Sequence, residues 1–496
     1  HVAQPAAVTT VTLPTDTGPV IGKMESAVWT FLGIPYAAPP VGPLRWRPPI
    51  APPPWRAPRD ATRKGAACPQ VTEGGFLRAT SEDCLNLNVW APMAARNTKL
   101  PVLVWIHGGA FFQGSGGDDF NDGARLATGA GMVVVTINYR LGPLGFLSHR
   151  ALAREEGRAA SPSFGLLDQR AALRWVQRNI AAFGGDPARV TIAGQSAGAW
   201  SVCTQLTAPG SRGLFSRAII QSGACSDALY FEPGKAEKQG EALAAAVGCT
   251  GPGVLDCLRA QRADKLLAAL PHKRSFILHP GVWWGPVIDG VELPRVPLTA
   301  MRAGDFAQVP LLIGWNRDEG VAHTVYLDTV TAADIADFVG DSFGETAIPS
   351  ASARYSRLPP KQALTDIVTD GIFACGARRV ARTFAAQGLP TYLYQWTHAL
   401  DAPRPHSLGA THSIELFLLW ANPFRDIVLS KREEPFSAML MQTWGRFARS
   451  GDPSGDDLRW PRYASDSDPF LKLDLVSEPQ AGLKRDECDF WDTLER

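Results

Sequence analysis

One serine stands in a setting that could make it a nucleophile. The run VTIAGQSAG at residues 190–198 leads from a β-rich stretch through Gly-x-Ser-x-Gly into a small-residue segment, typical of a helix, that begins at Ala197. A sharp strand-to-helix turn needs glycines at 194 and 198, because the neighbouring backbone crowds any larger side chain. A hydroxyl at a helix N-terminus also meets unpaired N–H groups, which favour developing negative charge. The sequence therefore predicts a nucleophile at Ser196.

A second stretch, upstream of the serine, has the composition of an anion-binding turn. Residues 103–112, LVWIHGGAFF, run from a β-rich segment into small residues, and such a turn leaves backbone N–H groups free to donate to an oxyanion. Glycines at 114, 116 and 117 would also suit a phosphate-binding loop. The chain lacks the Gly-x-x-x-x-Gly-Lys-Ser/Thr pattern of such loops, so we prefer the oxyanion interpretation.

The segments around these motifs alternate between strand and helix patterns. Residues 167–183 carry apolar side chains at Leu173, Val176, Ile180 and Phe183, which is the spacing of an amphipathic helix. Short apolar runs typical of buried strands lie on both sides of it, at 85–90, 102–107, 132–138, 190–193, 218–221 and 311–315. Strands that alternate with helices predict an α/β fold with a parallel sheet.

Other regions are expected to decorate this sheet. The proline-rich stretch 35–58 is incompatible with helix and predicts an extended strap over the surface. Residues 235–247 and 254–269 have helical patterns and are expected to pack over the sheet. Because we find no internal repeat or low-complexity tract, we interpret residues 1–496 as one expanded domain, although the length alone would allow about three.

Composition and charge exclude several classes of function. The chain has 496 residues, of which 45% are hydrophobic, and a net charge of +1, so it has no basic field for nucleic acid or anionic membranes. Its longest apolar stretches, such as Met132–Ile137, are too short to span a bilayer. The eight cysteines lack metal-ligand spacing and favour disulfides, hence a secreted or periplasmic location. The start at His1 predicts a mature chain from which a signal peptide was removed.

Together the motifs resemble those of the type-B carboxylesterases, the α/β-hydrolase family of bacterial para-nitrobenzyl esterases, mammalian carboxylesterases and cholinesterases. Besides the Ser196 and His107 motifs, the matching segments are FLGIPYA at 31–37, SEDCLNLNVW at 81–90, NYR at 138–140, GLLDQ at 165–169, FGGD at 183–186 and QSG at 221–223. The resemblance covers most of residues 10–490. It implies an α/β-hydrolase fold, with a mostly parallel central sheet flanked by helices and with large helical and loop insertions.

The nucleophile needs a histidine to take its proton and a carboxylate to orient that histidine. In α/β-hydrolases both follow the serine in the chain, which leaves open which histidine acts among His272, His279, His323, His398, His406 and His412. The resemblance assigns His412, in GATHSIE at 409–415, as the base. It assigns Glu319, in GWNRDEG at 314–320, as the acid, with Asp318 as the neighbouring alternative.

The resemblance also implies the remaining parts of the site. The backbone N–H groups of Gly109, Ala110 and Ala197 would bind the oxyanion, with Ala110 where many relatives have glycine. Contacts with the substrate are expected from Gln195, Phe111, Val282 and Ala322. The implied reaction is hydrolysis of a small-molecule carboxylic ester. Ser196 attacks the carbonyl, and water then hydrolyses the acyl-enzyme without a metal or another cofactor.

Departures from the family bear on the substrate. Gln195 precedes the nucleophile where many relatives have glutamate, so a negative charge is missing beside Ser196. The aromatic residues of cholinesterases are absent after Gly320, so choline esters are not expected. Basic residues in loops expected at the entrance favour anionic or polycarboxylate esters, although solvated surface charge is the alternative; they are His272, Lys273, Arg274, Arg404 and His406.

The resemblance pairs six of the cysteines. The implied disulfides are Cys68–Cys84, Cys249–Cys257 and Cys375–Cys488, which leaves Cys203 and Cys225 as expected buried thiols. Two alternative functions stay open at this stage. One is a lipase-like hydrolase of longer-chain esters, and the other is a non-catalytic relative that only binds. The sequence does not distinguish a monomer from a dimer.

Overall fold

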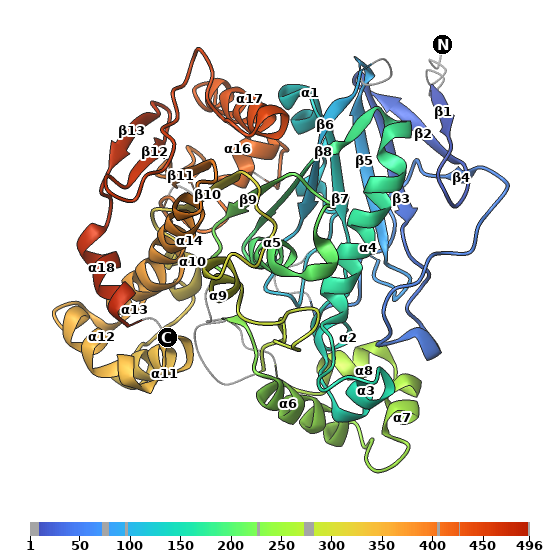
Figure 1. The fold of residues 1–496 in the computed structure, drawn as a ribbon, viewed down its shortest axis with the longest axis horizontal. Helices are drawn as coiled ribbons and strands as arrows, with labels where there is room; N and C mark the ends of the chain where they lie inside the picture. The colour runs from blue at the N-terminus through green and yellow to red at the C-terminus, as the bar shows by residue number, and fades with distance from the viewer. Residues whose placement is uncertain are drawn as a thin grey trace.

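A 13-stranded sheet runs through the computed structural model, which describes residues 9–71, 79–94, 98–225, 229–271, 282–403, 407–425 and 427–494. In spatial order its strands are β1 (Thr10–Leu13), β2 (Val20–Glu25), β3 (Val28–Pro35), β5 (Asn86–Pro92), β7 (Val133–Ile137), β6 (Leu100–Ile106), β8 (Gly185–Gln195), β9 (Arg217–Gln221), β10 (Leu311–Asn316), β11 (Thr391–Trp396), β12 (Pro469–Leu473) and β13 (Glu478–Ala481). The short β4 (Arg59–Asp60) pairs with β2. Strands from β7 to β12 run parallel to their neighbours, and the pairs towards both edges are antiparallel. The predicted mostly parallel sheet is confirmed (Figure 1).

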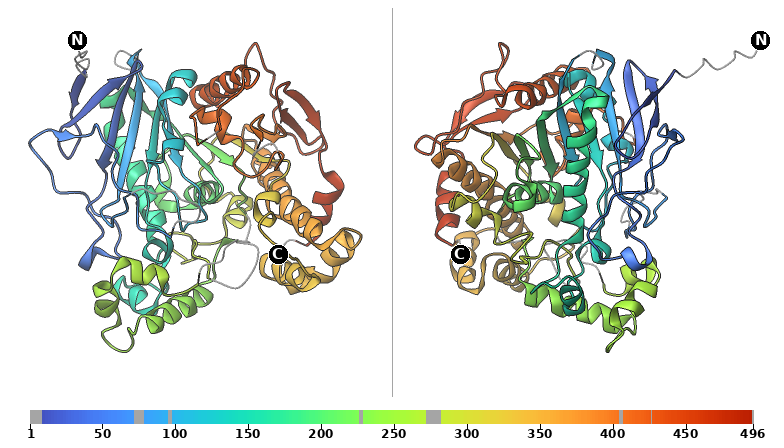
Figure 2. Two further views of the ribbon diagram at one scale, coloured as in Figure 1. Left: turned by 180° about the vertical axis from the view of Figure 1, so that it is seen from behind. Right: turned by 45° about the vertical axis from the view of Figure 1, so that its right-hand side comes forward.

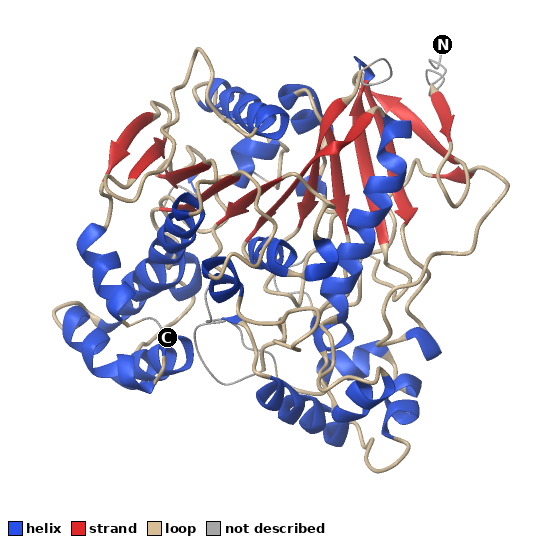
Figure 3. Cartoon of the chain, viewed as in Figure 1, coloured by secondary structure: helices blue, strands red, loops and turns tan. Residues whose placement is uncertain are grey.

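Helices cover both faces of this sheet (Figure 3). One face packs against α4 (Phe164–Asn179), α5 (Ala197–Thr207) and α14 (Cys375–Ala386), and the other against α1 (Ala124–Ala130), α16 (Leu416–Trp420) and α17 (Glu433–Ser450). Strand β6 shows the origin of the two cores, because successive side chains of a strand point to opposite faces. Val104 and Ile106 lie in the first core, and Leu103 and Trp105 lie in the second.

The remaining helices lie in insertions between strands. They are α2 (Gly142–Phe146), α3 (Arg150–Glu155), α6 (Pro233–Ala246), α7 (Val254–Ala260), α8 (Ala263–Ala268), α9 (Pro297–Arg302), α10 (Val321–Thr324), α11 (Ala332–Phe343), α12 (Ile348–Tyr355), α13 (Pro360–Ile367), a π-helical segment Val368–Ala374, and α18 (Arg485–Thr493). The helix expected at 254–269 is split into α7 and α8 at Gln261 and Arg262. Helices α3, α6, α7 and α8 gather beyond one end of the sheet in each view, and β1 and α18 lie at opposite ends of the molecule (Figure 2).

The proline-rich strap is extended along most of its length. Residues 36–58 contain one 3₁₀ turn, Gly42–Leu44, and otherwise no regular helix or strand. Other single 3₁₀ turns are Asp119–Asn121, Ile180–Phe183, Pro209–Ser211 and Glu345–Ala347. None of the helices in the described part of the chain is both long and apolar enough to cross a bilayer.

The carboxyl ends of the central strands are aligned at one edge of the sheet. Ile106 pairs with Gly194, Gln195 pairs with Gln221, and Gln221 pairs with Gly314. The loops that follow β6, β8 and β10 therefore start side by side. In open α/β sheets this edge is where ligands bind.

Four disulfides tie distant segments together, and one of them corrects the sequence prediction. Cys68–Cys84, Cys249–Cys257 and Cys375–Cys488 are the pairs that the resemblance implies. Cys203 and Cys225 also form a bridge, so the prediction of buried thiols is wrong. The reason is topological, because β8 pairs with β9 and the segments that follow these strands carry the two cysteines. Their Cα atoms are thereby brought to 5.3 Å, within the range that a disulfide spans.

We expect the double substitution Cys203→Ser and Cys225→Ser to lower the free energy of unfolding by about 3 kcal/mol, because the unfolded chain regains the freedom of the closed loop. Urea unfolding of the variant and the wild type under oxidising conditions would measure the difference. Peptide mapping without reduction provides the control, since the wild type must yield one peptide that joins the two segments. Alkylation of either thiol in the denatured, unreduced wild type would contradict the bridge.

Candidate active site

Ser196 lies in a strained turn between β8 and α5. Its backbone has φ 56° and ψ −127°, a conformation that L-residues rarely adopt, and its N–H donates to the Gln221 carbonyl at 3.0 Å. A Cβ on Gly194 would lie 2.4 Å from the Gly198 carbonyl, and one on Gly198 would lie 2.0 Å from the Ile106 carbonyl. Both positions therefore require glycine. Such strain costs about 1–3 kcal/mol and persists only where the surrounding structure enforces it.

The glycine turn after β6 lies directly against this serine. A Cβ on Gly108 would be 3.2 Å from the Ser196 Cβ. Three successive residues have left-handed backbone, with φ 103° at Gly109, 57° at Ala110 and 62° at Phe111. Among the hydrogen bonds of the described residues, none uses the N–H groups of Gly109, Ala110 or Ala197 as donors. These amides are therefore available to an anion at the serine.

His107 packs against Tyr139 and contacts the glycine turn that follows β6. Its ring stacks on Tyr139 with centroids 4.4 Å apart, and its Nδ1 lies 2.8 Å from the Gly108 carbonyl oxygen, to which it donates when protonated there. The Tyr139 hydroxyl donates to the His107 carbonyl at 3.0 Å. Burial lowers the pKa of His107 to about 4, so the ring is neutral at neutral pH. These contacts stabilise the glycine turn.

Glu319 and His412 meet at the carboxyl edge of the sheet. Glu319 follows β10 and is fully buried, with one carboxylate oxygen 2.5 Å from His412 Nδ1 and the other accepting the Asn316 N–H at 2.7 Å. His412 lies in the loop after β11. The two loops are joined by an isolated bridge between Asp318 and Thr411. This arrangement fixes the ring with Nδ1 towards the carboxylate and Nε2 facing away from it.

The structure describes the alternative acid and two of the alternative histidines, His323 and His398. Asp318 accepts the Ala410 N–H at 2.8 Å and pairs with Arg317, so its carboxylate does not contact His412. His323 lies nearby, with its ring 5.0 Å from that of His412, and burial holds its pKa well below the usual range. His272, His279 and His406 lie outside the described residues.

His398 belongs to a separate buried cluster with Asp401 and Glu433, whose ligand atoms lie close enough together to suggest a metal site. The groups are already satisfied by one another and by their neighbours. His398 Nε2 lies 2.9 Å from Glu433, and Asp401 accepts from Ser430 and pairs with Arg432. The chemistry of this donor set is that of an ion-pair network, so we assign no metal to it.

Gln195 is bound to His412. Its amide Nε2 lies 3.1 Å from His412 Nε2, and the Gln195 side chain is almost fully buried. With Nδ1–H directed at Glu319, the neutral ring presents Nε2 as an acceptor, so the amide is the donor. Within the described residues, no hydrogen bond joins the Ser196 hydroxyl to His412. The resting structure thus holds His412 through Gln195.

A second buried carboxylate, Glu415, lies beneath this pair. It accepts from Asn316 Nδ2 at 2.6 Å and from Gln221 Nε2 at 3.3 Å. Burial raises its pKa to about 7, against the effect of the Asn316 hydrogen bond, and the nearby charge of Glu319 adds to the rise. Near neutral pH a substantial fraction of Glu415 is therefore uncharged. The sequence analysis did not identify this residue, although it lies three positions after His412.

A cavity of about 270 Å³ adjoins the glycine turn. Its aromatic lining comes from Trp105, Phe120, Phe417 and Phe424. Its polar lining includes Gln70, Gln195 and Asp118, whose carboxylate is the only charged group among the described residues that line the cavity. These residues come from four separate segments, so no local sequence pattern could have grouped them. The one signal for this cavity in the sequence was the position of Phe120, which follows soon after the glycine-rich run 114–117.

The other residues predicted to contact the substrate differ in how far they are buried. Phe111 has no exposed surface and packs against Phe146, so its side chain belongs to the core. Ala322 is half-buried on α10, beside His323. Val282 is also half-buried and lies directly after a segment outside the described residues. The basic residues expected at the entrance, 272–274, 404 and 406, fall outside the described residues as well.

Comparison with known proteins identifies the family. The carboxylesterase family model matches residues 8–491. Fumonisin B1 esterase of Sphingopyxis macrogoltabida is 36% identical over 473 residues, covering 90% of this chain and 84% of that protein. Carboxylesterase 4A of Bos taurus is 33% identical over 519 residues, covering 96% and 92%.

Solved structures agree with this result. A PNB esterase structure has a TM-score of 0.88 and 33% identity, covering 97% of this chain and 100% of that one. A thermophilic PNB esterase has a TM-score of 0.89 and 32% identity, also covering 97% and 100%. The chain therefore belongs to the carboxylesterase family of α/β-hydrolases and is a carboxylic-ester hydrolase.

Proposed function

We propose that the protein hydrolyses carboxylic esters with Ser196 as nucleophile, His412 as general base and Glu319 as the carboxylate that orients the base. The observation that carries the proposal is the 2.5 Å contact between the buried Glu319 and His412 Nδ1. It leaves Nε2 directed at the residue next to the strained Ser196. A carboxylate in this position stabilises the imidazolium that forms when the serine loses its proton.

The reaction then follows from the geometry. An ester carbonyl against Ser196 places its oxygen near the N–H groups of Gly109, Ala110 and Ala197. The Gln195 amide leaves His412 Nε2, which takes the serine proton and returns it to the departing alcohol. Water repeats the sequence on the acyl-enzyme. Each lost oxyanion donor costs about 3–4 kcal/mol of transition-state stabilisation.

The neutral form of Glu415 limits the negative charge beneath His412. Two ionised carboxylates in this buried setting would repel each other, and the raised pKa of Glu415 relieves that repulsion by protonation. Glu319 is then the principal charge that faces the imidazolium. This division of charge supports the assignment of Glu319 as the acid.

We further propose anionic or polycarboxylate esters as substrates. Support comes from Gln195, which places a neutral amide where a carboxylate beside Ser196 would repel an acidic ester. The cavity near Gly109 is aromatic and carries Asp118, so it suits an uncharged part of the ester. The anionic part would lie on another side of the nucleophile. Similarity to the fumonisin B1 esterase makes fumonisin B1 a substrate to test.

The four disulfides support a further proposal, that the protein works in an oxidising compartment, either secreted or in a periplasm. Such bonds persist where thiols are not kept reduced.

Replacing Ser196 with alanine should lower ester turnover to below about 1% of wild type, because no other group supplies the nucleophile. Hydrolysis of para-nitrophenyl acetate would measure the loss. A fluorophosphonate probe should label the wild type and fail to label the variant, and thermal unfolding should be unchanged. Turnover that survives in the variant would refute the assignment of Ser196.

The neighbouring carboxylates 318 and 319 supply a matched control for the acid. Glu319→Gln should lower kcat by at least about 1,000-fold, because the amide cannot stabilise the imidazolium. Asp318→Asn removes a charge one residue away that does not contact His412. Comparable losses in the two variants would exclude Glu319 as the specific partner.

Gln195→Glu should lower kcat/KM for an ester that bears a carboxylate about tenfold more than for a neutral ester of equal size, because the new charge repels the first and not the second. Gln195→Leu is the control, since it removes the hydrogen bond to His412 without adding charge. It should change both substrates equally. Equal effects of glutamate on both esters would reject the preference for anions.

The pH dependence of stability tests Glu415. Because folding raises its pKa from about 4.5 to about 7, the folded state binds the proton more tightly, and the stabilisation it provides is lost as pH rises through this range. Between pH 4.5 and pH 8 the free energy of unfolding of the wild type should therefore fall by roughly 3 kcal/mol relative to that of Glu415→Gln. Urea unfolding at both pH values would measure it. A difference that does not vary with pH would show that Glu415 keeps an ordinary pKa.

A further inference from the structure

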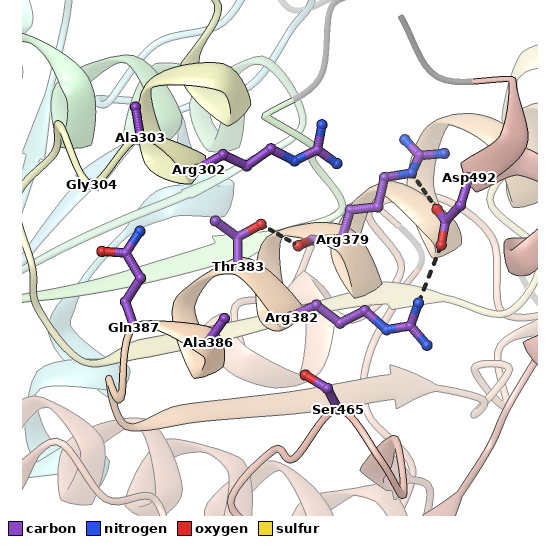
Figure 4. Close-up of a pocket in the computed structure, with 10 residues that line it drawn as sticks. All are labelled: Arg302, Ala303, Gly304, Arg379, Arg382, Thr383, Ala386, Gln387, Ser465 and Asp492. Carbon is purple, nitrogen blue, oxygen red and sulfur yellow. Dashed lines mark hydrogen bonds and ion pairs between the residues drawn. The ribbon is translucent and has the colours of Figure 1, made fainter.

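A second cavity, of about 710 Å³, lies apart from the candidate active site. It is formed by the end of α9, one face of α14, the segment just before β12, and α18, and none of its described lining residues belongs to the proposed ester-hydrolysing machinery. Its walls carry Arg302, Arg379 and Arg382 and a single carboxylate, Asp492. Figure 4 shows the three arginine side chains directed towards the side of the cavity where Asp492 lies.

The carboxylate is shared between two of the arginines. Arg379 Nε donates to one oxygen of Asp492 at 2.7 Å, and Arg382 Nη1 donates to the other at 3.3 Å. The Arg379 side chain is 5% exposed and that of Arg382 is 32% exposed. One guanidinium is thus held almost entirely within protein, while the second keeps a face towards the cavity.

The wall behind these residues is rigid. The disulfide Cys375–Cys488 joins α14 to α18, so Asp492 is fixed relative to the arginines. Arg378 donates to Asp489 at 2.5 Å, which adds a second link between the same helices. Arg382 also donates to the buried Asp468 at 3.1 Å. A preformed wall of this kind binds a ligand without the cost of ordering its side chains.

Arginine is the main charged residue type in the described lining of the cavity. Arg302, Arg379 and Arg382 line it together with one carboxylate, that of Asp492. The buried Arg382 Nε has no hydrogen-bond partner among the described residues. Guanidinium groups bind carboxylates and phosphates through paired N–H donors, and several around one cavity select ligands with more than one negative group.

We propose that this cavity is an anion-binding site for a small molecule with two or more carboxylate or phosphate charges. Arg302 and Arg382 contact the ligand, and Arg379 and Asp492 hold the geometry of the wall. The exposed Ser465 lies at the rim and can donate to the ligand. The size of the cavity accommodates a tricarboxylate. The proposal does not depend on which ester the enzyme hydrolyses.

Isothermal titration of the disulfide-bonded chain of residues 1–496 with citrate and with inorganic phosphate at low ionic strength tests the proposal, with acetate as the singly charged comparison. We expect one citrate per chain, weaker phosphate binding, and no acetate binding. Arg302→Gln should weaken citrate binding about tenfold, because it removes one guanidinium contact with a citrate carboxylate. The Arg302 side chain is exposed, so the change should not disturb the core. Arg382→Gln should weaken it at least as much.

The matched control is Arg262→Gln, which changes an arginine that is 84% exposed, is paired with Asp264 and lies outside the cavity. It should bind citrate as the wild type does. Ser196→Ala should also bind citrate unchanged, which separates this site from the one that hydrolyses esters. No citrate binding at concentrations up to about 10 mM, or binding that neither Arg302→Gln nor Arg382→Gln weakens, would overturn the proposal.

Discussion

The left-handed turn at Ser196 is the constraint on which the rest of the site depends. The residue adopts φ 56° because Gly194 and Gly198 allow β8 and α5 to approach more closely than any side chain would permit. This conformation strains the backbone, and the surrounding structure maintains it. The N–H of Ser196 is tied to β9, and the Cys203–Cys225 bridge ties α5 to the segment after β9. Stability and function are thus coupled at this turn.

The second constraint on the site is the burial of its ionisable groups. Glu319, Glu415 and His412 lie in the segments that follow β10 and β11, where they are largely shielded from water. Asn316 mediates between the two carboxylates, because its backbone N–H binds Glu319 and its side-chain amide binds Glu415. Because burial raises the pKa of Glu415, the site avoids carrying two full negative charges. The desolvation that would destabilise an isolated carboxylate is offset for Glu319 by its hydrogen bonds to Asn316 and His412.

The sequence predicted the centre of the fold better than its edges. Strands β5 to β10 were recognisable because they are buried on both faces and read as short apolar runs. Strands β1 and β13 are half-exposed or exposed, and β11 is buried but carries Thr391, Tyr392 and Gln395, so none gives such a run. The motifs located Ser196 and the glycine turn by local pattern. The pairing of Glu319 with His412 came from family resemblance, because residues 93 positions apart carry no spacing signal.

What the sequence could not predict are relations that only packing creates. Cys203 and Cys225 became partners because two adjacent strands set their distance, and the Phe111 side chain lies in the core at the end of a turn in which Gly109, Ala110 and Phe111 all have positive φ. Gln195 is the clearest case. Its type suggested only a missing charge, whereas its position gives it a hydrogen bond to His412 Nε2, the atom that we propose as the acceptor of the serine proton. The amide at this position occupies Nε2, so it competes there with any hydrogen bond from the Ser196 hydroxyl. The glutamine at position 195 therefore affects both the charge beside Ser196 and the hydrogen bonding of His412.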